Sequence, residues 1–305
     1  MEHVPVLLTE AVEALVQDAD GTYVDCTFGR GGHSARIIEQ LSSKGRLMVL
    51  DKDPDAIAIA HQLYADDSRV SVVHGAFAEL GSLLAVSGFG QVDGILMDLG
   101  VSSVQLDSAR RGFSFQKDGP LDMRMDNSKG GSAAKWLNAA ALNEIAKVLK
   151  TLGEEKFARK IAAAIVRQRA VKPLETTLEL ADLVASTIPR REKNKHPATR
   201  TFQAIRIHVN QELAELQACL GQVLELLCEK GRLVVISFHS LEDRIVKRFI
   251  RDLEKNDPYP SRLPITSDQI VKPVRSLGKS IAKQAEILVN PRSRSAVMRV
   301  MEKII

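Results

Sequence analysis

Short apolar runs separated by amphipathic stretches make up the first hundred residues. Each run is too short for a typical helix and is largely apolar on both faces, as expected of a strand buried on both sides of a sheet. The runs lie at residues 23–26, 46–50, 70–73 and 92–97. The stretches between them predict helices over residues 35–41, 55–64 and 76–86. Strands that alternate with helices indicate a parallel sheet with right-handed crossovers.

This alternation stops near residue 107 and resumes only after residue 200. Apolar residues four apart (Phe157, Ile161, Ile165) predict a helix over residues 154–169. We also expect helices over 177–188 and 200–228, a fifth buried strand over 233–238 and a last strand over 296–305. The predicted fold class is α/β: a doubly wound, Rossmann-like sheet domain (residues 1–106 and 205–305) with an inserted helical domain (residues 107–204).

Composition excludes several classes of protein. None of the apolar runs in the 305 residues approaches the roughly 20 residues of a membrane span, so we expect no membrane partner. Residues 1–5 lack the basic region and apolar core of a signal peptide. The three cysteines (Cys26, Cys219, Cys228) show no metal-site spacing. They favour reduced thiols in a cytoplasmic protein, and we predict no metal.

Positive charge is concentrated in one segment of the chain. The net charge is only +4, but residues 190–206 carry six cations against one acid. The cations are Arg190, Arg191, Lys193, Lys195, Arg200 and Arg206. Such a cluster suits contacts to phosphates, as in nucleic-acid binding. A solvated cationic face is the alternative.

A glycine-rich turn follows the first apolar run. Residues 25–34 read Asp-Cys-Thr-Phe-Gly-Arg-Gly-Gly-His-Ser, and Asp51 ends the next run. Glycines at a strand-to-helix turn let the backbone approach a nucleotide, and an acid about twenty residues later can bind ribose hydroxyls. The spacing is G-x-G-G rather than the G-x-G-x-x-G of dehydrogenases, which favours a turn that binds S-adenosylmethionine. A plain tight turn is the alternative.

Three acidic or aromatic side chains follow predicted strands, at the sheet edge where open α/β sheets bind ligands. Asp51 and Asp53 are alternative candidates for binding the ribose. Asp53 precedes Pro54 and is instead expected to cap a helix. Phe77 can stack on an adenine or belong to the core. Asp98 can accept a hydrogen bond from an exocyclic amine and take up its proton, or it can cap the next turn.

Eight motifs extend over nearly the whole chain. They lie at residues 3–8, 25–34, 93–105, 111–115, 119–126, 196–204, 236–244 and 290–296. In these motifs the chain resembles the bacterial 16S rRNA cytosine-N4 methyltransferases of the RsmH/MraW type. The resemblance implies an enzyme that uses S-adenosylmethionine to methylate N4 of one cytidine in the decoding region of 16S rRNA. It also implies that the helical insertion recognises the substrate.

The resemblance assigns cofactor contacts to Gly31, Gly32, His33, Asp51, Phe77, Asp98 and Gln105. Asp98 is the expected catalytic residue. Taken alone, His33 also fits a first-turn residue that offers only its backbone N–H, and Gln105 fits a plain loop glutamine. Val104 stands where the family has proline, which we expect to loosen the loop carrying Gln105.

The candidates for RNA contacts are Trp136, Arg200, Asn210, Arg292 and Arg294. Trp136 can stack on an extruded base or pack in the core, and Asn210 can read a cytosine edge or be a helix-face amide. The arginines can hold phosphates or pair with surface acids. His239 is a second catalytic candidate, although its place before Ser240, an expected helix cap, favours a structural role.

Two rival functions share parts of this pattern. A nicotinamide-dependent oxidoreductase would share the glycine turn and the ribose acid, but the G-x-G-G spacing and the basic segment disfavour it. An inactive RNA-binding protein of ribosome assembly would share the cations, but the acids Asp51 and Asp98 argue against it. The sequence leaves open whether 16S rRNA is bound free or within the small subunit, and whether the chain forms a homodimer.

Overall fold

The computed structural model describes residues 5–188, 196–255 and 272–305. It divides into two compact units: a sheet unit (Met1–Gly100 and Leu213–Ile305) and a helical unit (Val101–Glu212). Four cations of the predicted cluster, Arg190, Arg191, Lys193 and Lys195, lie outside the described residues, as do residues 3 and 4 of the first motif.

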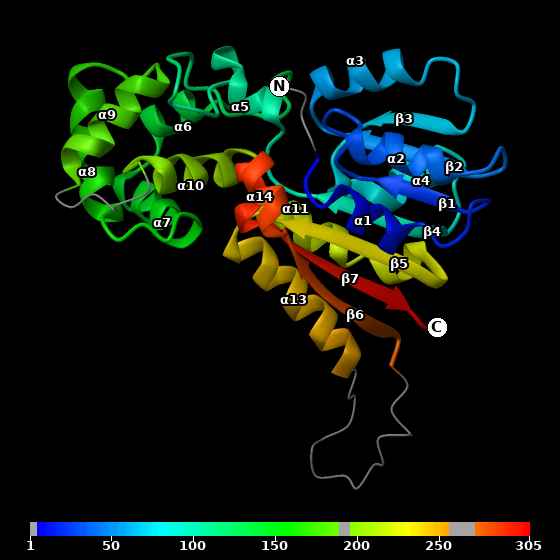
Figure 1. Cartoon of the computed structure of the whole chain (residues 1–305). Helices are drawn as coiled ribbons and strands as arrows, with labels where there is room; N and C mark the ends of the chain where they lie inside the picture. Colours follow the sequence, from blue (N-terminus) through cyan, green and yellow to red (C-terminus); the bar gives the residue numbers. More distant parts are fainter. Residues whose placement is uncertain (1–4, 189–195, 256–271) are drawn as a thin grey trace, which may run out of the picture. The chain divides into compact units, whose positions relative to one another are not determined.

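The strands described in the sheet unit form one sheet in the order β3-β2-β1-β4-β5-β7-β6 (Figure 1). They are β1 (Thr22–Asp25), β2 (Arg46–Asp51), β3 (Val70–His74), β4 (Val92–Asp98), β5 (Leu227–Ser237), β6 (Val274–Ile281) and β7 (Val297–Lys303). Strands β1 to β5 are parallel, whereas β7 is antiparallel to both of its neighbours. The five predicted parallel strands and the doubly wound, Rossmann-like fold are confirmed. The strand order reverses at β1 and β4, which is where such sheets bind ligands.

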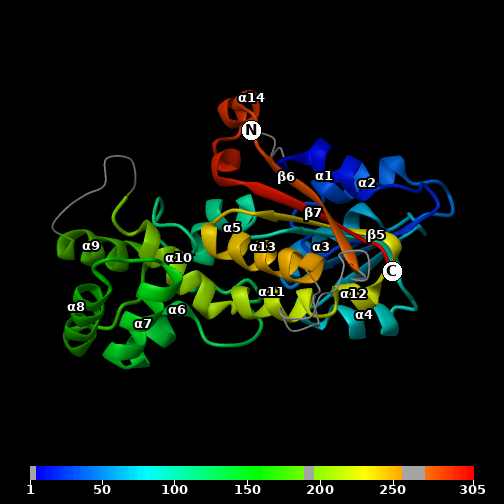
Figure 2. The ribbon, with the colours of Figure 1, turned by 90° about the horizontal axis from the view of Figure 1, so that it is seen from below.

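Helices cover both faces of this sheet. Adjacent strand residues face opposite cores, with Val24 and Met48 in one and Tyr23 and Leu47 in the other. Figure 2 shows α1 and α2 on one side of the sheet and α4, α11 and α12 on the other. The helices of the unit are α1 (Leu8–Leu15), α2 (Gly32–Gln40), α3 (Pro54–Leu63), α4 (Leu80–Val86), α11 (Glu212–Leu220), α12 (Val223–Leu226), α13 (Ser240–Lys255) and α14 (Gln284–Val289). Burial on both faces explains why the strands lack a polar side.

The helical unit has a hydrophobic core of its own. Its helices are α5 (Ser103–Asp107), α6 (Ala133–Ala139), α7 (Leu142–Leu152), α8 (Ala158–Val171), α9 (Thr177–Thr187) and α10 (Thr199–Val209). Ile161 and Ile165 of α8 are fully buried, as the spacing predicted. No helix in the described part of the chain is both long and apolar enough to cross a membrane.

The helix expected over residues 200–228 is wrong as a single element. Three helices, α10, α11 and α12, occupy these residues, and β5 begins at Leu227. The first break follows Asn210, because Gln211 adopts a left-handed backbone with φ 54°. The helical spacing of apolar residues continues across this break, so the local sequence does not indicate it. Strand β6 and helix α1 were not predicted, and β6 has only a partly buried pattern.

Candidate cofactor and catalytic site

The glycine turn joins β1 to α2, which begins at Gly32. Gly29 and Gly31 have φ of 55° and 77°, values that side chains disfavour. A Cβ at Gly31 would lie 2.6 Å from the Phe28 ring, and one at Gly32 would lie 2.1 Å from Cγ of Pro5. The turn therefore excludes side chains at both positions, which lets a ligand approach its backbone closely. The N–H groups of Gly29 and Gly31 themselves donate within the chain, to Asp51 and to the Phe28 carbonyl.

Asp51 ends β2 and closes one side of this turn. Its Oδ2 accepts a hydrogen bond from the Gly29 N–H at 2.8 Å, and its Oδ1 accepts one from the Asp53 N–H at 2.8 Å. Burial raises the pKa of the Asp51 carboxyl to about 6. A carboxylate has about four acceptor positions, so Asp51 keeps capacity for ribose hydroxyls. Asp53 caps α3 by accepting from the Asp55 N–H at 3.0 Å, as predicted.

Asp25 is a structural acid that the sequence interpretation missed. It is 1% exposed and ties the two ends of the glycine turn together. Its Oδ2 accepts from the Ser34 hydroxyl at 2.6 Å and its Oδ1 from the Thr27 N–H at 3.1 Å. Burial raises the pKa of Asp25 despite these bonds. The signal that could have found it is an acid within the otherwise apolar run at residues 23–26.

Asp98 ends β4, the strand beside β1. Its backbone N–H donates to the Thr27 hydroxyl at 2.6 Å, and its Oδ2 lies 3.7 Å from Nδ1 of His33. Its Oδ1 is buried and has no hydrogen-bond partner within the described residues. Burial raises the pKa of Asp98 well above its usual range, and the acids Asp25 and Glu242 raise it further.

These features fit a ligand that carries neighbouring hydroxyl groups, such as a nucleoside. The glycine turn allows a ligand close to its backbone, and Asp51 keeps acceptor capacity for two hydroxyls beside the N–H groups of Gly29 and Asp53. A buried carboxylate oxygen without a partner is rare in folded proteins, and the Asp98 oxygen is free to accept a hydrogen bond from a ligand or a water molecule. A carboxyl whose pKa is raised by burial is also suited to exchanging a proton.

Phe77 and Gln105 have their own structural contacts. Phe77 starts a short 3-10 helix, η1 (Phe77–Glu79), and packs partly buried against the sheet core. Gln105 belongs to the helical unit, where its Oε1 accepts from the Ser102 N–H at 3.0 Å and its N–H donates to the Ser102 hydroxyl at 3.3 Å. Val104 lies within α5, so the loosened loop that we expected there is not observed.

His239 sits at the start of α13 and contacts Glu242 through both ring nitrogens. Its Nδ1 accepts from the Glu242 N–H at 3.4 Å, and its Nε2 lies 3.2 Å from Glu242 Oε1. Glu242 Oε2 in turn accepts from the Phe238 N–H at 2.8 Å. The contact of Nδ1 favours a structural role, but the buried Nε2 makes no hydrogen bond within the described residues, so the catalytic role of His239 stays a prediction. Arg292 and Arg294 are exposed on a short 3-10 helix, η4 (Pro291–Ser295).

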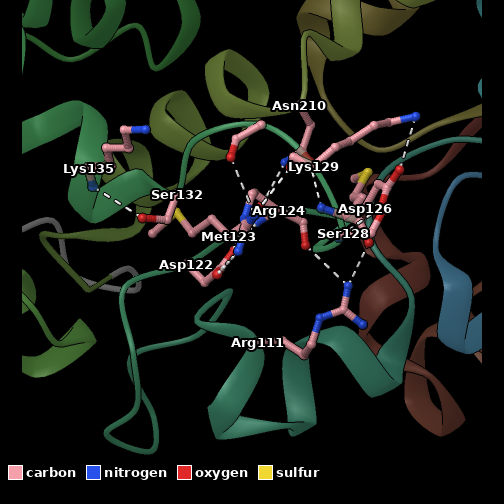
Figure 3. Close-up of polar contacts among 12 residues, drawn as sticks. Arg111, Asp122, Met123, Arg124, Asp126, Ser128, Lys129, Ser132, Lys135 and Asn210 are labelled. Atoms are coloured by element: carbon pink, nitrogen blue, oxygen red, sulfur yellow. Dashed lines mark hydrogen bonds and ion pairs between the residues drawn. The ribbon is translucent and has the colours of Figure 1, made fainter.

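In the helical unit, Asn210 and Trp136 are both held by neighbours. Figure 3 shows Asn210 against the loop of Met123: its Oδ1 accepts from the Met125 N–H at 2.7 Å and its Nδ2 donates to the Met123 carbonyl at 2.7 Å. Trp136 donates to Glu144 at 2.9 Å, and its ring lies 4.3 Å from the ring of His208. These contacts favour the structural alternatives, while RNA contact remains a prediction. Arg200 lies in the first turn of α10.

Comparison with known proteins places the chain among methylases. The model of the MraW methylase family matches residues 1–304. Ribosomal RNA small subunit methyltransferase H of Chromobacterium violaceum is 55% identical over 303 residues, which cover 99% of this chain and 95% of the relative.

Solved structures give a weaker likeness. An rRNA methylase from Streptococcus thermophilus is 10% identical with a TM-score of 0.43, covering 98% of this chain and 94% of that chain. The N-methyltransferase NodS from Bradyrhizobium japonicum is 10% identical with a TM-score of 0.43 and the same coverage. The fold is established by the strand order rather than by these likenesses. From the family match and the 55% identical relative, we conclude that the chain belongs to the MraW methylase family.

Proposed function

We propose that this chain transfers a methyl group from S-adenosylmethionine to N4 of a cytidine in the decoding region of 16S rRNA. Membership of a methylase family supports the reaction class, and the name of the relative, Ribosomal RNA small subunit methyltransferase H, supports the RNA. The observation that carries the site is Asp98, whose buried Oδ1 has no partner in the described part of the chain.

The cofactor would supply an electrophilic methyl group on a positively charged sulfur. Gly31 and Gly32 would hold it through the backbone of the glycine turn, and Asp51 would bind its ribose hydroxyls. Phe77 is proposed to stack on its adenine. The family resemblance adds Gln105 as a further cofactor contact.

Asp98 is proposed to act on the exocyclic amine of the cytosine. This amine is a weak nucleophile because its lone pair is delocalised into the ring. An acceptor for one of its hydrogens localises that pair and takes up the proton as the new bond forms. A base works best when its pKa approaches the working pH, and burial moves the pKa of Asp98 in that direction. The cytidine must leave its stack to reach such a site.

The helical unit is proposed to recognise the RNA, within the small subunit. Between residues 101 and 212 the sequence has 20 lysines and arginines against 12 aspartates and glutamates, whereas the whole chain has a net charge of only +4. An excess of cations of this size suits the phosphate backbone and predicts salt-sensitive binding. The proposed contacts are Trp136, Arg200 and Asn210 of the helical unit, together with Arg292 and Arg294 of the sheet unit.

Transfer of a tritiated methyl group to 16S rRNA tests this function. Wild type should label small subunits or free 16S rRNA, and mass mapping of nucleosides should find N4-methylcytidine. Asp98→Asn should lower the rate by about 10²-fold or more, the usual contribution of a general base. Asp66→Asn, a matched change at an exposed acid, should leave it unchanged. Wild-type rates in Asp98→Asn would refute the catalytic role, and label on another base would refute the assignment.

A further inference from the structure

His33 in α2 makes a contact through each of its ring nitrogens. It is 5% exposed, and its Nε2 lies 3.1 Å from the carbonyl oxygen of Val6. A carbonyl can only accept a hydrogen bond, so Nε2 carries the hydrogen. In the neutral ring Nδ1 is therefore the basic nitrogen. That nitrogen lies 3.7 Å from Oδ2 of Asp98.

The carbonyl of Val6 is held in place by contacts from distant parts of the sheet unit. Pro5 packs so closely on the glycine turn that a Cβ at Gly32 would lie 2.1 Å from it. Leu7 is fully buried with a left-handed φ of 52°, and its N–H donates to Oε1 of Glu286 at 2.8 Å. We call residues 5–7 the N-terminal strap. Because the strap is fixed by the fold, the tautomer of His33 is set before any substrate binds.

The groups that face Asp98 come from three elements. They are Asp25 of β1, His33 of α2 and Glu242 of α13, the last of which also contacts His239. Asp98 thus has two carboxyl groups and the imidazole of His33 as neighbours. A positive charge on His33 would lower the pKa of the neighbouring Asp25. Catalytic hydrogen bonds often shorten when substrates bind. A small decrease in the distance between Asp98 and Nδ1 of His33 would let a proton on Asp98 reach a basic nitrogen.

We propose that His33 is a positioning residue that acts through Asp98, taking over the proton that Asp98 receives from the cytosine amine. This proposal depends on the function proposed above. As the lone pair of N4 forms the bond to the methyl carbon, the carbon–sulfur bond breaks and its electron pair stays on sulfur. One N4 proton passes to Asp98 Oδ1. A proton then passes from the Asp98 carboxyl to His33 Nδ1, which restores the carboxylate and leaves an imidazolium.

His33→Gln tests the relay, because a glutamine amide can still donate to Val6 but has no basic nitrogen. With saturating cofactor and small subunits, kcat should fall about 10- to 100-fold while the KM for the cofactor stays within about threefold. An unchanged kcat would overturn the proposal, as would a loss seen only in the cofactor KM.

Nitrogen NMR of histidine-labelled wild-type protein tests the tautomer without any variant. Neutral His33 should carry its hydrogen on Nε2, and a hydrogen on Nδ1 would overturn the proposal. Glu286→Ala, which frees the N-terminal strap, should weaken this tautomer preference, and Glu286→Gln, which keeps an acceptor for Leu7, should not. Failure of wild type to methylate RNA would refute the proposed function instead, and leaves the tautomer measurement as a separate result.

Discussion

Replacing Asn210 by alanine removes three hydrogen bonds from the core of the helical unit. The amide accepts from the Met125 N–H at 2.7 Å and donates to the carbonyls of Met123 at 2.7 Å and Arg206 at 2.9 Å. Met123 is fully buried and has a left-handed φ of 63°, a strained conformation that surrounding contacts must maintain. We expect the substitution to destabilise the helical unit.

The size of the effect follows from the groups left behind. Met125 N–H and Met123 C=O would lose this partner in a buried place, at about 1–3 kcal/mol each. Water that enters the vacated space offsets part of this cost. We therefore expect the free energy of unfolding to fall by about 2–4 kcal/mol. With a urea m-value of about 2 kcal/mol per molar, the midpoint would fall by about 1–2 M.

Urea unfolding followed by tryptophan fluorescence measures this change in the relevant unit. Trp136 is the only tryptophan of the chain and lies in the helical unit, so it reports on that unit even if the two units unfold separately. Asn143→Ala, at an exposed position of α7, is the matched control and should change stability by no more than about 0.5 kcal/mol. If Asn210→Ala unfolds like wild type but no longer methylates RNA, the structural reasoning is wrong and Asn210 reads the base.

Two further predictions concern the glycine turn. Because the pKa of Asp51 is raised from 3.8 to about 6, its contribution to stability is present below pH 3.8 and is lost as pH rises through 6. The affinity for S-adenosylhomocysteine should depend on pH with the opposite sign, and calorimetry should show it weakening as pH falls through 6. In Asp51→Asn the affinity should not change with pH. The same pH dependence in this variant as in wild type would contradict the assignment. Gly32→Ala should displace Pro5, since the new Cβ would lie 2.1 Å from it, and should lower methyl transfer more than tenfold. A wild-type rate in that variant would show that the strap can move without consequence.

The sequence by itself determined the parallel strands of the sheet unit and the places of several candidate site residues along them. The apolar runs have a local period, and the chain order of strands and helices allows few topologies, so five parallel strands followed directly. The glycine turn, Asp51 and Asp98 were placed correctly at strand ends because a residue that ends a parallel strand must lie at the ligand-binding edge. Each of these inferences needs only neighbours along the chain.

Only the tertiary structure decided which groups meet. Glu286 bonds to Leu7 across 279 residues, and Asn210 bonds to Met123 and Met125 across 87 and 85. Such contacts leave no periodic signal, so neither the N-terminal strap nor the break after α10 was predicted. The buried oxygen of Asp98 is also a tertiary result, because burial and the lack of a partner depend on every element around the carboxylate. Local sequence decides where strands and helices form, but long-range packing decides which polar groups find partners and which are left for a ligand.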